Sequence, residues 1–410
     1  MTNDPPSAMY TVGNPPNQVQ IAFSGYADPS MRRDPAITTA NPYGTNLWML
    51  YSYPLFNQSG APVTYSGAVE THLAYSNPNP SGEPGGVAWA AWCTTTPSCP
   101  SATAMWPSVQ SNSPTYPYPT QFSSHEVPNF WPYNNNWYAV HLMYFVIPPD
   151  SIPKSIGKSG CFVMTVAQTT PTNLAEGWAA NTLNQCGATL PNDTIATNVE
   201  ISFTQLNGWS GASCSVWGEP AIMVDNTGPA YLAAACFNKN FEATLGYYIF
   251  STSLASYPTL STWTGYAGPI YLADLPDASF YQGLGATYLT EFDWARRADG
   301  TLVGMVSPAV ETGQNTVSQF GCVVVNLNPP ASWPSGSGSF FGSVVATLTD
   351  IDTPQTGTIS EAYGPNACTY EPTSNTGVLI VRRLVNTALT KPYSPTQYQL
   401  YSLIDTGVMP

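Results

Sequence analysis

The sequence predicts an all-β fold, a five-bladed β-propeller whose ring is closed by an N-terminal strand that joins the last blade. Two observations lead to this prediction. A polar residue followed by a strand, a turn and a second strand occurs five times along the 410 residues, and no long helical pattern lies between the copies. A strand hairpin that returns at intervals of roughly 70 to 95 residues is typical of blades arranged around one axis.

The five copies differ in sequence but share their order of elements. They run over Arg33–Ser52, His125–Phe145, Gly218–Phe237, Thr290–Ser307 and Pro365–Leu384. The polar residues that open them are Asp34, Glu126, Glu219, Glu291 and Asn366. Because the first strand of each propeller blade lines the central channel, we expect these five side chains to meet near one end of it.

Each hairpin is followed by further apolar strands. Third strands are expected at Val69–Ser76, Cys161–Gln168, Tyr247–Ser253, Cys322–Leu327 and Tyr398–Ile404, and outer strands at Gly86–Trp92, Val199–Leu206, Thr262–Tyr271 and Val344–Thr349. We expect one domain over 1–410, with blades at about 30–115, 122–210, 215–275, 286–350 and 362–406. The last blade lacks an outer strand, which a strand at 18–25 is expected to supply, so that no sheet edge stays free. A β-sandwich of similar strand content is the alternative fold.

The composition excludes several classes of function. Charged residues make up 8% of the chain, and the formal net charge is −14. Nucleic acid is therefore not an expected partner, because phosphate binding needs clustered cations. No apolar run is long enough to span a membrane. A surface of Ser, Thr, Asn, Gln and Tyr suits an extracellular or acidic setting.

The cysteines favour a secreted protein. They are eight, an even number, and disulfides form in oxidising compartments. The expected pairs are Cys93–Cys99, which would close a tight loop, and Cys186–Cys214. Cys161 and Cys322 occupy equivalent strand positions, where each can instead be a buried thiol. The first residues lack the features of a signal peptide, as expected of a mature secreted domain.

Carboxylates are concentrated at the blade openings. The chain has only 24 acidic residues, yet Asp34, Glu126 and Glu219 open the first three blades, and the fourth offers Glu291 and Asp293. Crowded carboxylates repel one another, which shifts their pKa values apart. Glycoside hydrolysis needs such a difference, because one carboxyl must stay protonated while another is ionised.

The order of these acids resembles that of the five-bladed glycoside hydrolases, which include arabinanases, arabinofuranosidases, β-xylosidases and the related fructosidases. Asp34-Pro35-Ala36-Ile37, followed by the aromatic strand Leu47–Ser52, is similar to their first blade. Glu219-Pro220-Ala221-Ile222 is similar to their third. Glu126 stands where these enzymes carry an aspartate, and Asp28-Pro29-Ser30-Met31 is a rival match for the first motif.

The resemblance implies a role for each acid. Asp34 would be the general base or the nucleophile, Glu219 the general acid, and Glu126 the residue that orients the acid or raises its pKa. Further substrate contacts are expected from Arg33, His125, Glu291, Asp293 and Asn366. The expected substrate is an oligo- or polysaccharide, and the expected protein is a monomer. No cofactor is required, although a structural Ca²⁺ in the channel is compatible with this function.

Three other functions stay open. Paired arginines, and Arg33 near the first strand, resemble the sialidases, which would act on acidic sugars. A carbohydrate-binding propeller without catalysis is the second, but blade openings that differ favour one asymmetric site and hence an enzyme. The third is a calcium-dependent hydrolase of the lactonase or esterase type. Its oxygen ligands would be Glu126, Glu219, Asp293 and Asn366.

Overall fold

The computed structural model describes most of the chain. The described residues are 2–3, 9–12, 19–22, 27–35, 47–55, 68–77, 88–93, 103–111, 121–146, 152–178, 184–239, 243–256, 263–313, 316–348, 362–372, 378–384 and 398–403.

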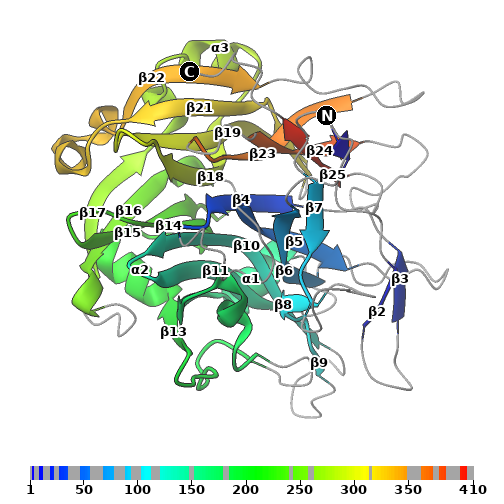
Figure 1. The fold of residues 1–410 in the computed structure, drawn as a ribbon. Helices are drawn as coiled ribbons and strands as arrows, with labels where there is room; N and C mark the ends of the chain where they lie inside the picture. Colours follow the sequence, from blue (N-terminus) through cyan, green and yellow to red (C-terminus); the bar gives the residue numbers. More distant parts are fainter. Residues whose placement is uncertain are drawn as a thin grey trace.

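Four antiparallel sheets built from consecutive strands form four complete blades around a common centre (Figure 1). The first holds β4 (Ala27–Arg33), β5 (Leu47–Leu55), β6 (Ala68–Asn77) and β7 (Ala88–Ala91), with β8 (Ala104–Trp106) beside β6. The second holds β10 (Gln121–Tyr133), β11 (Asn136–Val146), β12 (Cys161–Gln168) and β13 (Ala196–Ser202), with β9 (Gln110–Ser111) beside β10. The third holds β14 (Val216–Val224), β15 (Pro229–Phe237), β16 (Tyr247–Ser253) and β17 (Thr264–Ile270). The fourth holds β18 (Tyr288–Arg296), β19 (Leu302–Gly313), β21 (Cys322–Leu327) and β22 (Phe341–Leu348), with β20 (Thr316–Gln319) beside β19.

The predicted all-β propeller is confirmed, but the structure shows four complete blades and not the five expected. The remaining sheet joins β23 (Ala362–Tyr370), β24 (Val378–Leu384) and β25 (Tyr398–Leu403) to the two-residue strand β1 (Thr2–Asn3). The predicted closing strand at 18–25 is wrong. Strand β3 (Val19–Ala22) pairs with β2 (Met9–Val12) in a separate hairpin, because a partner nearby in sequence costs less loop entropy.

Short helices connect the strands. They are α1 (Ile152–Ser159), α2 (Phe203–Ser210) and α3 (Ala278–Gly283), with the 3₁₀ turns η1 (Pro171–Ala175), η2 (Ala243–Leu245), η3 (Leu254–Ser256), η4 (Leu272–Asp274), η5 (Pro330–Ser335) and η6 (Ser337–Ser339). The outer strand predicted at Val199–Leu206 stops at Ser202, because Ser202 and Gln205 form a capping box that starts α2. Within the described ranges, the helices are too short or too polar to cross a bilayer.

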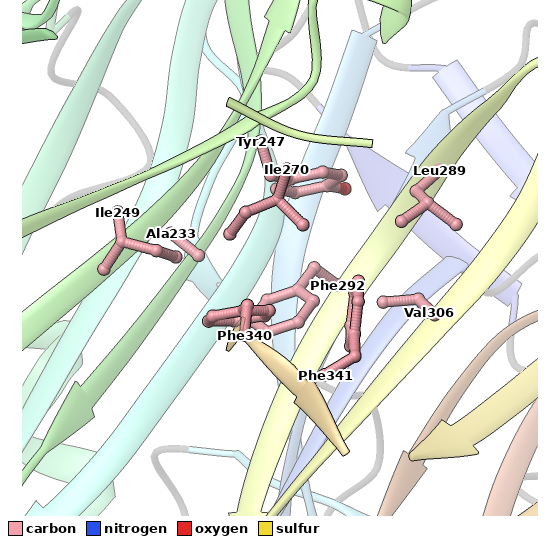
Figure 2. A pocket seen from close by; sticks show the side chains of 9 residues that line it. All are labelled: Ala233, Tyr247, Ile249, Ile270, Leu289, Phe292, Val306, Phe340 and Phe341. Atoms are coloured by element: carbon pink, nitrogen blue, oxygen red, sulfur yellow. The ribbon is translucent and has the colours of Figure 1, made fainter. Parts of the chain in front are cut away.

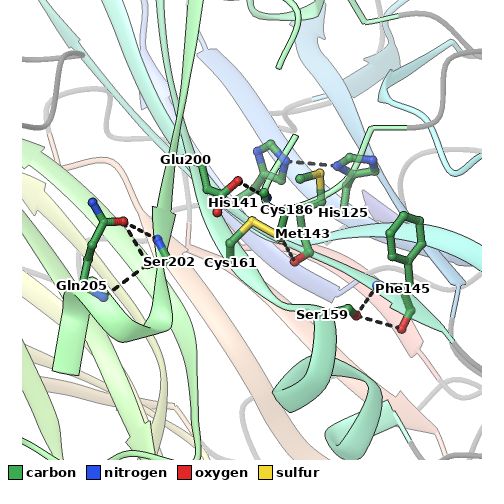
Figure 3. Close-up of a disulfide and its surroundings, with 11 residues drawn as sticks. His125, His141, Met143, Phe145, Ser159, Cys161, Cys186, Glu200, Ser202 and Gln205 are labelled. Carbon is green, nitrogen blue, oxygen red and sulfur yellow. Dashed lines mark hydrogen bonds between the residues drawn. A yellow bond between two sulfur atoms is a disulfide. The ribbon is translucent and has the colours of Figure 1, made fainter. Parts of the chain in front are cut away.

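Disulfides join neighbouring strands and loops differently from the prediction. Cys161 bonds Cys186, shown in Figure 3, and Cys214 bonds Cys236, so the predicted Cys186–Cys214 pair is wrong. Cys322 is also disulfide-bonded, so neither it nor Cys161 is a thiol. Cys93 is disulfide-bonded too, but the predicted pair with Cys99 lies outside the described residues.

The innermost strands of the sheets surround the axis. Strand β4 contacts β10 and β23, and β18 contacts β14 and β23, while β10 also contacts β14 (Figure 1). Large aromatic side chains fill the space between the sheets. The fully buried tryptophans are Trp48, Trp106, Trp137, Trp217, Trp263, Trp294 and Trp333. Each buried aromatic ring removes roughly 150–250 Å² from water, which makes these contacts a main source of stability.

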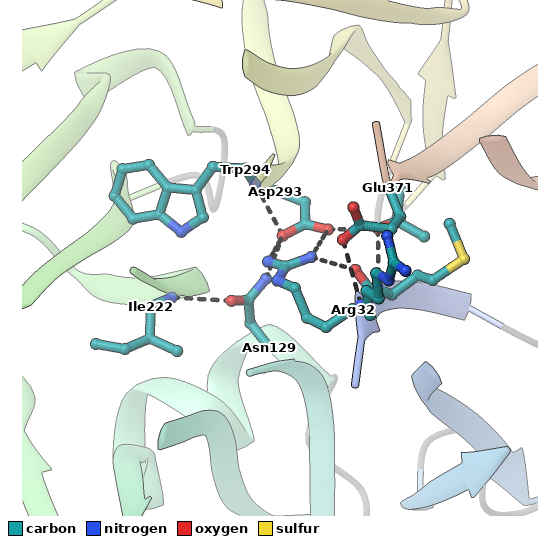
Figure 4. A network of polar contacts seen from close by, with 9 residues as sticks. Arg32, Asn129, Ile222, Asp293, Trp294 and Glu371 are labelled. Carbon is teal, nitrogen blue, oxygen red and sulfur yellow. Dashed lines mark hydrogen bonds and ion pairs between the residues drawn. The ribbon is translucent and has the colours of Figure 1, made fainter. Parts of the chain in front are cut away.

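A buried ion pair lies at the centre of the ring. The guanidinium of Arg32 binds the carboxylate of Asp293 with two parallel hydrogen bonds, from Nη1 to Oδ2 at 3.0 Å and from Nη2 to Oδ1 at 2.5 Å (Figure 4). The face of Trp131 covers the guanidinium, with 5.0 Å between the guanidinium carbon and the ring centre. Both charged side chains are buried, so each depends on the other for its charge to be tolerated.

Side chains from other inner strands complete this ion pair. Asn129 on β10 donates to Asp293 Oδ1 at 2.7 Å and accepts the N–H of Ile222 on β14 at 3.0 Å. The Thr369 hydroxyl on β23 donates to Asp293 Oδ2 at 2.6 Å and accepts the N–H of Met31 on β4 at 2.9 Å. The pair with its Asn and Thr partners, here called the central hub, therefore fastens the inner strands of all these sheets together.

Replacing Asp293 with Asn tests the central hub, because it removes the charge that Arg32 faces and keeps the side-chain size. The guanidinium would stay buried without a counter-ion, so we expect the free energy of unfolding to fall by about 3–5 kcal/mol. Urea unfolding measures the change. The matched control is Asp225→Asn, which breaks the more exposed pair with Arg296 and should cost about 1 kcal/mol or less. Equal losses for the two variants would contradict the hub's central role.

Candidate active site

Four carboxyl side chains gather near the axis on the inner strands of the four blades. They are Asp28 on β4, Glu126 on β10, Glu219 on β14 and Glu291 on β18, and we call them the acidic cluster. One oxygen each from Asp28, Glu219 and Glu291 lies within 4.8 Å of the other two. The charge of Asp28 also acts on Glu126. All four residues are partly buried, and Oε2 of Glu219 is fully buried, so the cluster is surrounded by protein.

A repeated backbone irregularity places these side chains. In each of the four inner strands the ladder shifts register, and one residue at the shift has a positive φ. These residues are Asp28 at 49°, Val127 at 51°, Glu219 at 51° and Glu291 at 54°. Such a bulge re-aims a side chain. For residues other than glycine a positive φ costs about 1–2 kcal/mol, so strain is stored at four equivalent points around the axis.

Asp28, and not Asp34, is the acid of the first blade. Strand β4 begins at Ala27, so Asp28 lies at its start and Asp34 directly follows its end. Asp34 is buried and accepts a hydrogen bond from Trp48 Nε1 at 3.0 Å. The prediction chose the wrong one of two Asp-Pro pairs. A proline follows the bulge residue in Asp28-Pro29, Val127-Pro128 and Glu219-Pro220, but Asp34 also precedes a proline, so this signal alone does not separate the two aspartates.

Arg33 is likewise distant from the acidic cluster along its strand. It is the last residue of β4, five positions after Asp28, and its N–H donates to Glu371 at 3.2 Å. Its expected contact with substrate at the cluster is therefore not supported. Asp293 belongs to the central hub, where its oxygens accept bonds from within the protein. The side chain of Asn366 lies outside the described residues.

Glu126 reaches the cluster from one position before the bulge residue of its strand. Burial and the charge of Asp28 raise its pKa to about 8, although a hydrogen bond from Tyr144 opposes this shift. Neighbouring residues in a strand point to opposite faces of the sheet. Because Glu126 points toward the cluster, the side chain of His125 points away from it. Its Nδ1 lies 3.1 Å from Nε2 of His141 (Figure 3), and burial lowers its pKa to about 3. His125 was expected to contact substrate, and the structure places it in this histidine pair.

Bound protons reduce the repulsion among the other three carboxyls of the cluster. Burial, with the charges of Asp28 and Glu126, raises the pKa of Glu219 to about 8. Burial and the same kind of repulsion raise the pKa of Glu291 well above its ordinary range. Its carboxyl therefore keeps its single proton, for which Asp28 and Glu219 are the acceptors. Asp28 also accepts bonds from Ser52 and the Val127 N–H, which partly offset the burial that raises its pKa. The cluster therefore titrates as one unit.

A small cavity lies beneath the cluster, toward the central hub. Its volume is about 10 Å³, enough for one water molecule. Its walls are Asp28, Pro29, Val127, Pro128, Asn129, Pro220, Glu291, Phe292 and Asp293. The proline rings thus close the axis just below the acids, so that any larger ligand must approach the cluster from its own side.

The cluster can also be compared with a metal site. Ca²⁺ prefers carboxylate oxygens but takes about six to eight ligands. Here Asp28, Glu219 and Glu291 offer one oxygen each, and the carboxyl proton of Glu291 is shared with the other two acids. In this arrangement the three carboxyls fit shared protons and not a calcium ion. A structural Ca²⁺ elsewhere in the channel stays a prediction.

The raised pKa values predict how stability depends on pH. Glu126 and Glu219 bind protons more tightly in the folded protein, with pKa values of about 8 against an ordinary 4.5. Their stabilising contribution is complete below pH 4.5 and is lost as the pH rises through about 8. Below pH 6.5 the buried His125, whose pKa is lowered to about 3, acts in the opposite sense. Urea unfolding between pH 6.5 and 8 should therefore show the free energy of unfolding falling with pH. The double variant Glu126→Gln/Glu219→Gln should flatten the slope, and a stability that rises with pH would refute the assignment.

Comparisons with known proteins give distant structural matches only. No family model and no curated protein matches the sequence. An exo-1,5-α-L-arabinanase from a bovine ruminal metagenomic library is 12% identical over 92% of each chain, with a TM-score of 0.39. An α-L-arabinofuranosidase from Podospora anserina is 9% identical over 96% of this chain and 95% of its own, with a TM-score of 0.44. A Trypanosoma rangeli sialidase is 8% identical over 97% of this chain and 59% of its own, with a TM-score of 0.42. The matches include the kinds of enzyme that the sequence resembles, at a likeness too low to say what this chain does.

Proposed function

We propose that this protein is a secreted glycoside hydrolase that cleaves an oligo- or polysaccharide at the acidic cluster. The observation that carries the proposal is the gathering of four carboxyls, three of them on strained bulge residues, where burial raises the pKa values of Glu126 and Glu219 to about 8. Both the strain and the burial of these groups oppose folding. A protein that keeps such groups together at one end of its axis has a use for them.

The hydrogen bonds assign different roles to two of the acids. Glu219, with a pKa of about 8, is protonated at neutral pH and can donate its proton to the leaving oxygen as general acid. Burial raises the pKa of Asp28, but hydrogen bonds from Glu291, Ser52 and the Val127 N–H oppose this shift and favour the ionised form that a nucleophile needs. Asp28 thus takes the role that was expected of Asp34, and the charge of Glu126 helps to raise the pKa of Glu219.

The separation of the two carboxyls favours a retaining mechanism. One oxygen of Asp28 lies within 4.8 Å of one oxygen of Glu219, and carboxyls about 5 Å apart are typical of retention. Asp28 would attack the anomeric carbon while Glu219 protonates the departing oxygen. Glu219, now a carboxylate, would then take a proton from water, which releases the sugar from Asp28 and restores both groups.

The same proposal extends to the ring. We propose that the sheet of β23, β24 and β25 is the fifth blade, and that β1 is its outer strand. Thr2 pairs with Ser402 and Asn3 with Tyr401, and β23 contacts both β4 and β18. These contacts support a ring closed by the N-terminal residues, although not by the strand first expected.

Three of the described arginines do not support a sialidase-like site. Arg32 is paired with Asp293, Arg296 with Asp225, and Arg297 donates to Asn326. A carboxylate substrate needs arginines that are free to form paired hydrogen bonds with it. The second candidate is instead a calcium-dependent hydrolase, because the close oxygens of Asp28, Glu219 and Glu291 could approach one cation once their protons are lost.

Substitutions of single acids test the hydrolase proposal. On a panel of aryl pentosides, hexosides and sialosides, Glu219→Gln should lower turnover on the active glycoside by about two orders of magnitude or more. Asp28→Asn should do the same, because it removes the nucleophile. Asp34→Asn is the matched control, since it alters the other Asp-Pro pair, and its turnover should stay close to wild type. If Asp34→Asn lost turnover and Asp28→Asn kept it, the reaction centre would not be the acidic cluster.

Removal of metal ions separates the two candidate functions. After dialysis against a chelator, a glycosidase that depends on protonated carboxyls should keep its turnover. A calcium-dependent hydrolase would lose it and recover when Ca²⁺ is added back, because its metal polarises the substrate. Turnover on the active substrate and a circular dichroism spectrum should be recorded together, so that loss of the fold is not mistaken for loss of a catalytic ion.

A further inference from the structure

Two polar atoms beside the acidic cluster have no hydrogen-bond partner. One is the hydroxyl of Tyr247, whose side chain is only 3% exposed, and the other is Oε2 of Glu219. One is a donor and the other an acceptor. Buried polar groups are nearly always paired, so an unpaired donor close to an unpaired acceptor calls for an explanation.

The sheet register brings Tyr247 to the cluster. Tyr247 begins β16 and pairs with Ala235 on β15, which in turn pairs with Gly218, the residue before Glu219. The three therefore lie in one row across the blade. The missing Cβ of Gly218 leaves room for the ring of Phe237. The ring centre of Tyr247 lies 5.6 Å from that of Phe292 in the next blade.

The surroundings of the Tyr247 ring are apolar except at its hydroxyl. Figure 2 shows the pocket that it lines, in which Tyr247 carries the only side-chain oxygen. The other lining residues are Ala233, Ile249, Ile270, Leu289, Phe292, Val306, Phe340 and Phe341. Burial, and then the charges of Glu219 and Glu291, raise the pKa of Tyr247 well above 10. The hydroxyl therefore keeps its proton and can act as a donor at any pH at which the protein is folded.

The nearest backbone group does not satisfy this donor. The N–H of Phe292 points toward the hydroxyl oxygen and favours the ionised phenol, but an N–H can only donate. The hydroxyl hydrogen is left without an acceptor. The groups that face Glu219 from other strands are Asp28, Glu126 and Glu291, all acids. Tyr247 is thus a neutral donor near these acids, close enough to Glu219 for the charge of that carboxylate to raise its pKa.

We propose that Tyr247 is a positioning residue of the reaction centre, whose hydroxyl donates to Oε2 of Glu219 once that carboxyl has given up its proton. The inference rests on the proposed function, in which Glu219 is the general acid. The proton of Glu219 goes to the leaving oxygen, and Tyr247 keeps its own. A hydrogen bond to a carboxylate is about twice as strong as one to a neutral group, so it would form when the negative charge appears and stabilise it among three other acids.

A direct titration of Glu219 tests this role without a substrate. The infrared band of protonated carboxyls, followed against pH, assigns the Glu219 signal by its loss in Glu219→Gln. In Tyr247→Phe, which removes only the hydroxyl, the pKa of Glu219 should rise by about one unit or more, because the ionised form loses its donor. The control is Tyr281→Phe, another buried tyrosine, whose hydroxyl bonds Thr347 away from the cluster. An unchanged pKa of Glu219 in Tyr247→Phe would overturn the inference.

Turnover on the active aryl glycoside gives a second test. Tyr247→Phe should lower kcat/KM about ten-fold or more for a poor leaving group, and move the alkaline limb of its pH profile upward. A dinitrophenyl leaving group, which needs no acid, should show almost no loss. If Tyr247 only packs, removing an unpaired hydroxyl leaves stability unchanged or raised and the pH profile unmoved. If Glu219→Gln keeps full turnover, the proposed function fails, whatever Tyr247→Phe does to the titration.

Discussion

The ion pair between Arg32 and Asp293 is the interaction on which the arrangement of the inner strands depends. The two residues are 261 positions apart in the chain, and with Asn129 and Thr369 they connect strands from every large sheet around the axis. A buried pair of this kind adds little net stability over an apolar core. Its value lies in specificity, because only one alignment of the strands leaves no charge unpaired. That alignment also fixes where Glu291 stands, two residues before Asp293.

The acidic cluster, next to this hub, contains backbone strain and buried acids, both of which lower the stability of the fold. Three acids adopt a positive φ, and a fourth joins them from the neighbouring position on its strand. Burial raises their pKa values, so protons and not counter-ions relieve most of their repulsion. The low charge of the whole chain, at 8% charged residues, agrees with this chemistry. These carboxyls are therefore most stable in acid, whereas the buried His125, whose pKa burial lowers to about 3, favours the folded state at higher pH.

The sequence was sufficient to predict the propeller and to place Glu126, Glu219 and Glu291 on inner strands, because hairpins repeat locally. It did not separate Asp28 from Asp34, because both precede a proline and only the register of a bulge decides which one turns toward the axis. The disulfides were misassigned for a related reason. Cys161 and Cys186 meet through the fold of a loop, which spacing does not encode. Pairs that are distant in sequence, such as the hub, leave no local pattern at all.

Val127 has a consequence of its own. It holds the same bulge and the same backbone angle as the three acids at equivalent points of the ring, yet its side chain is a hydrocarbon. The backbone shape therefore does not depend on which residue it displays. A substitution at one of these bulge positions would therefore alter the chemistry at the axis and leave the sheets as they are. New reactions could evolve on this scaffold by substitution of one bulge residue at a time.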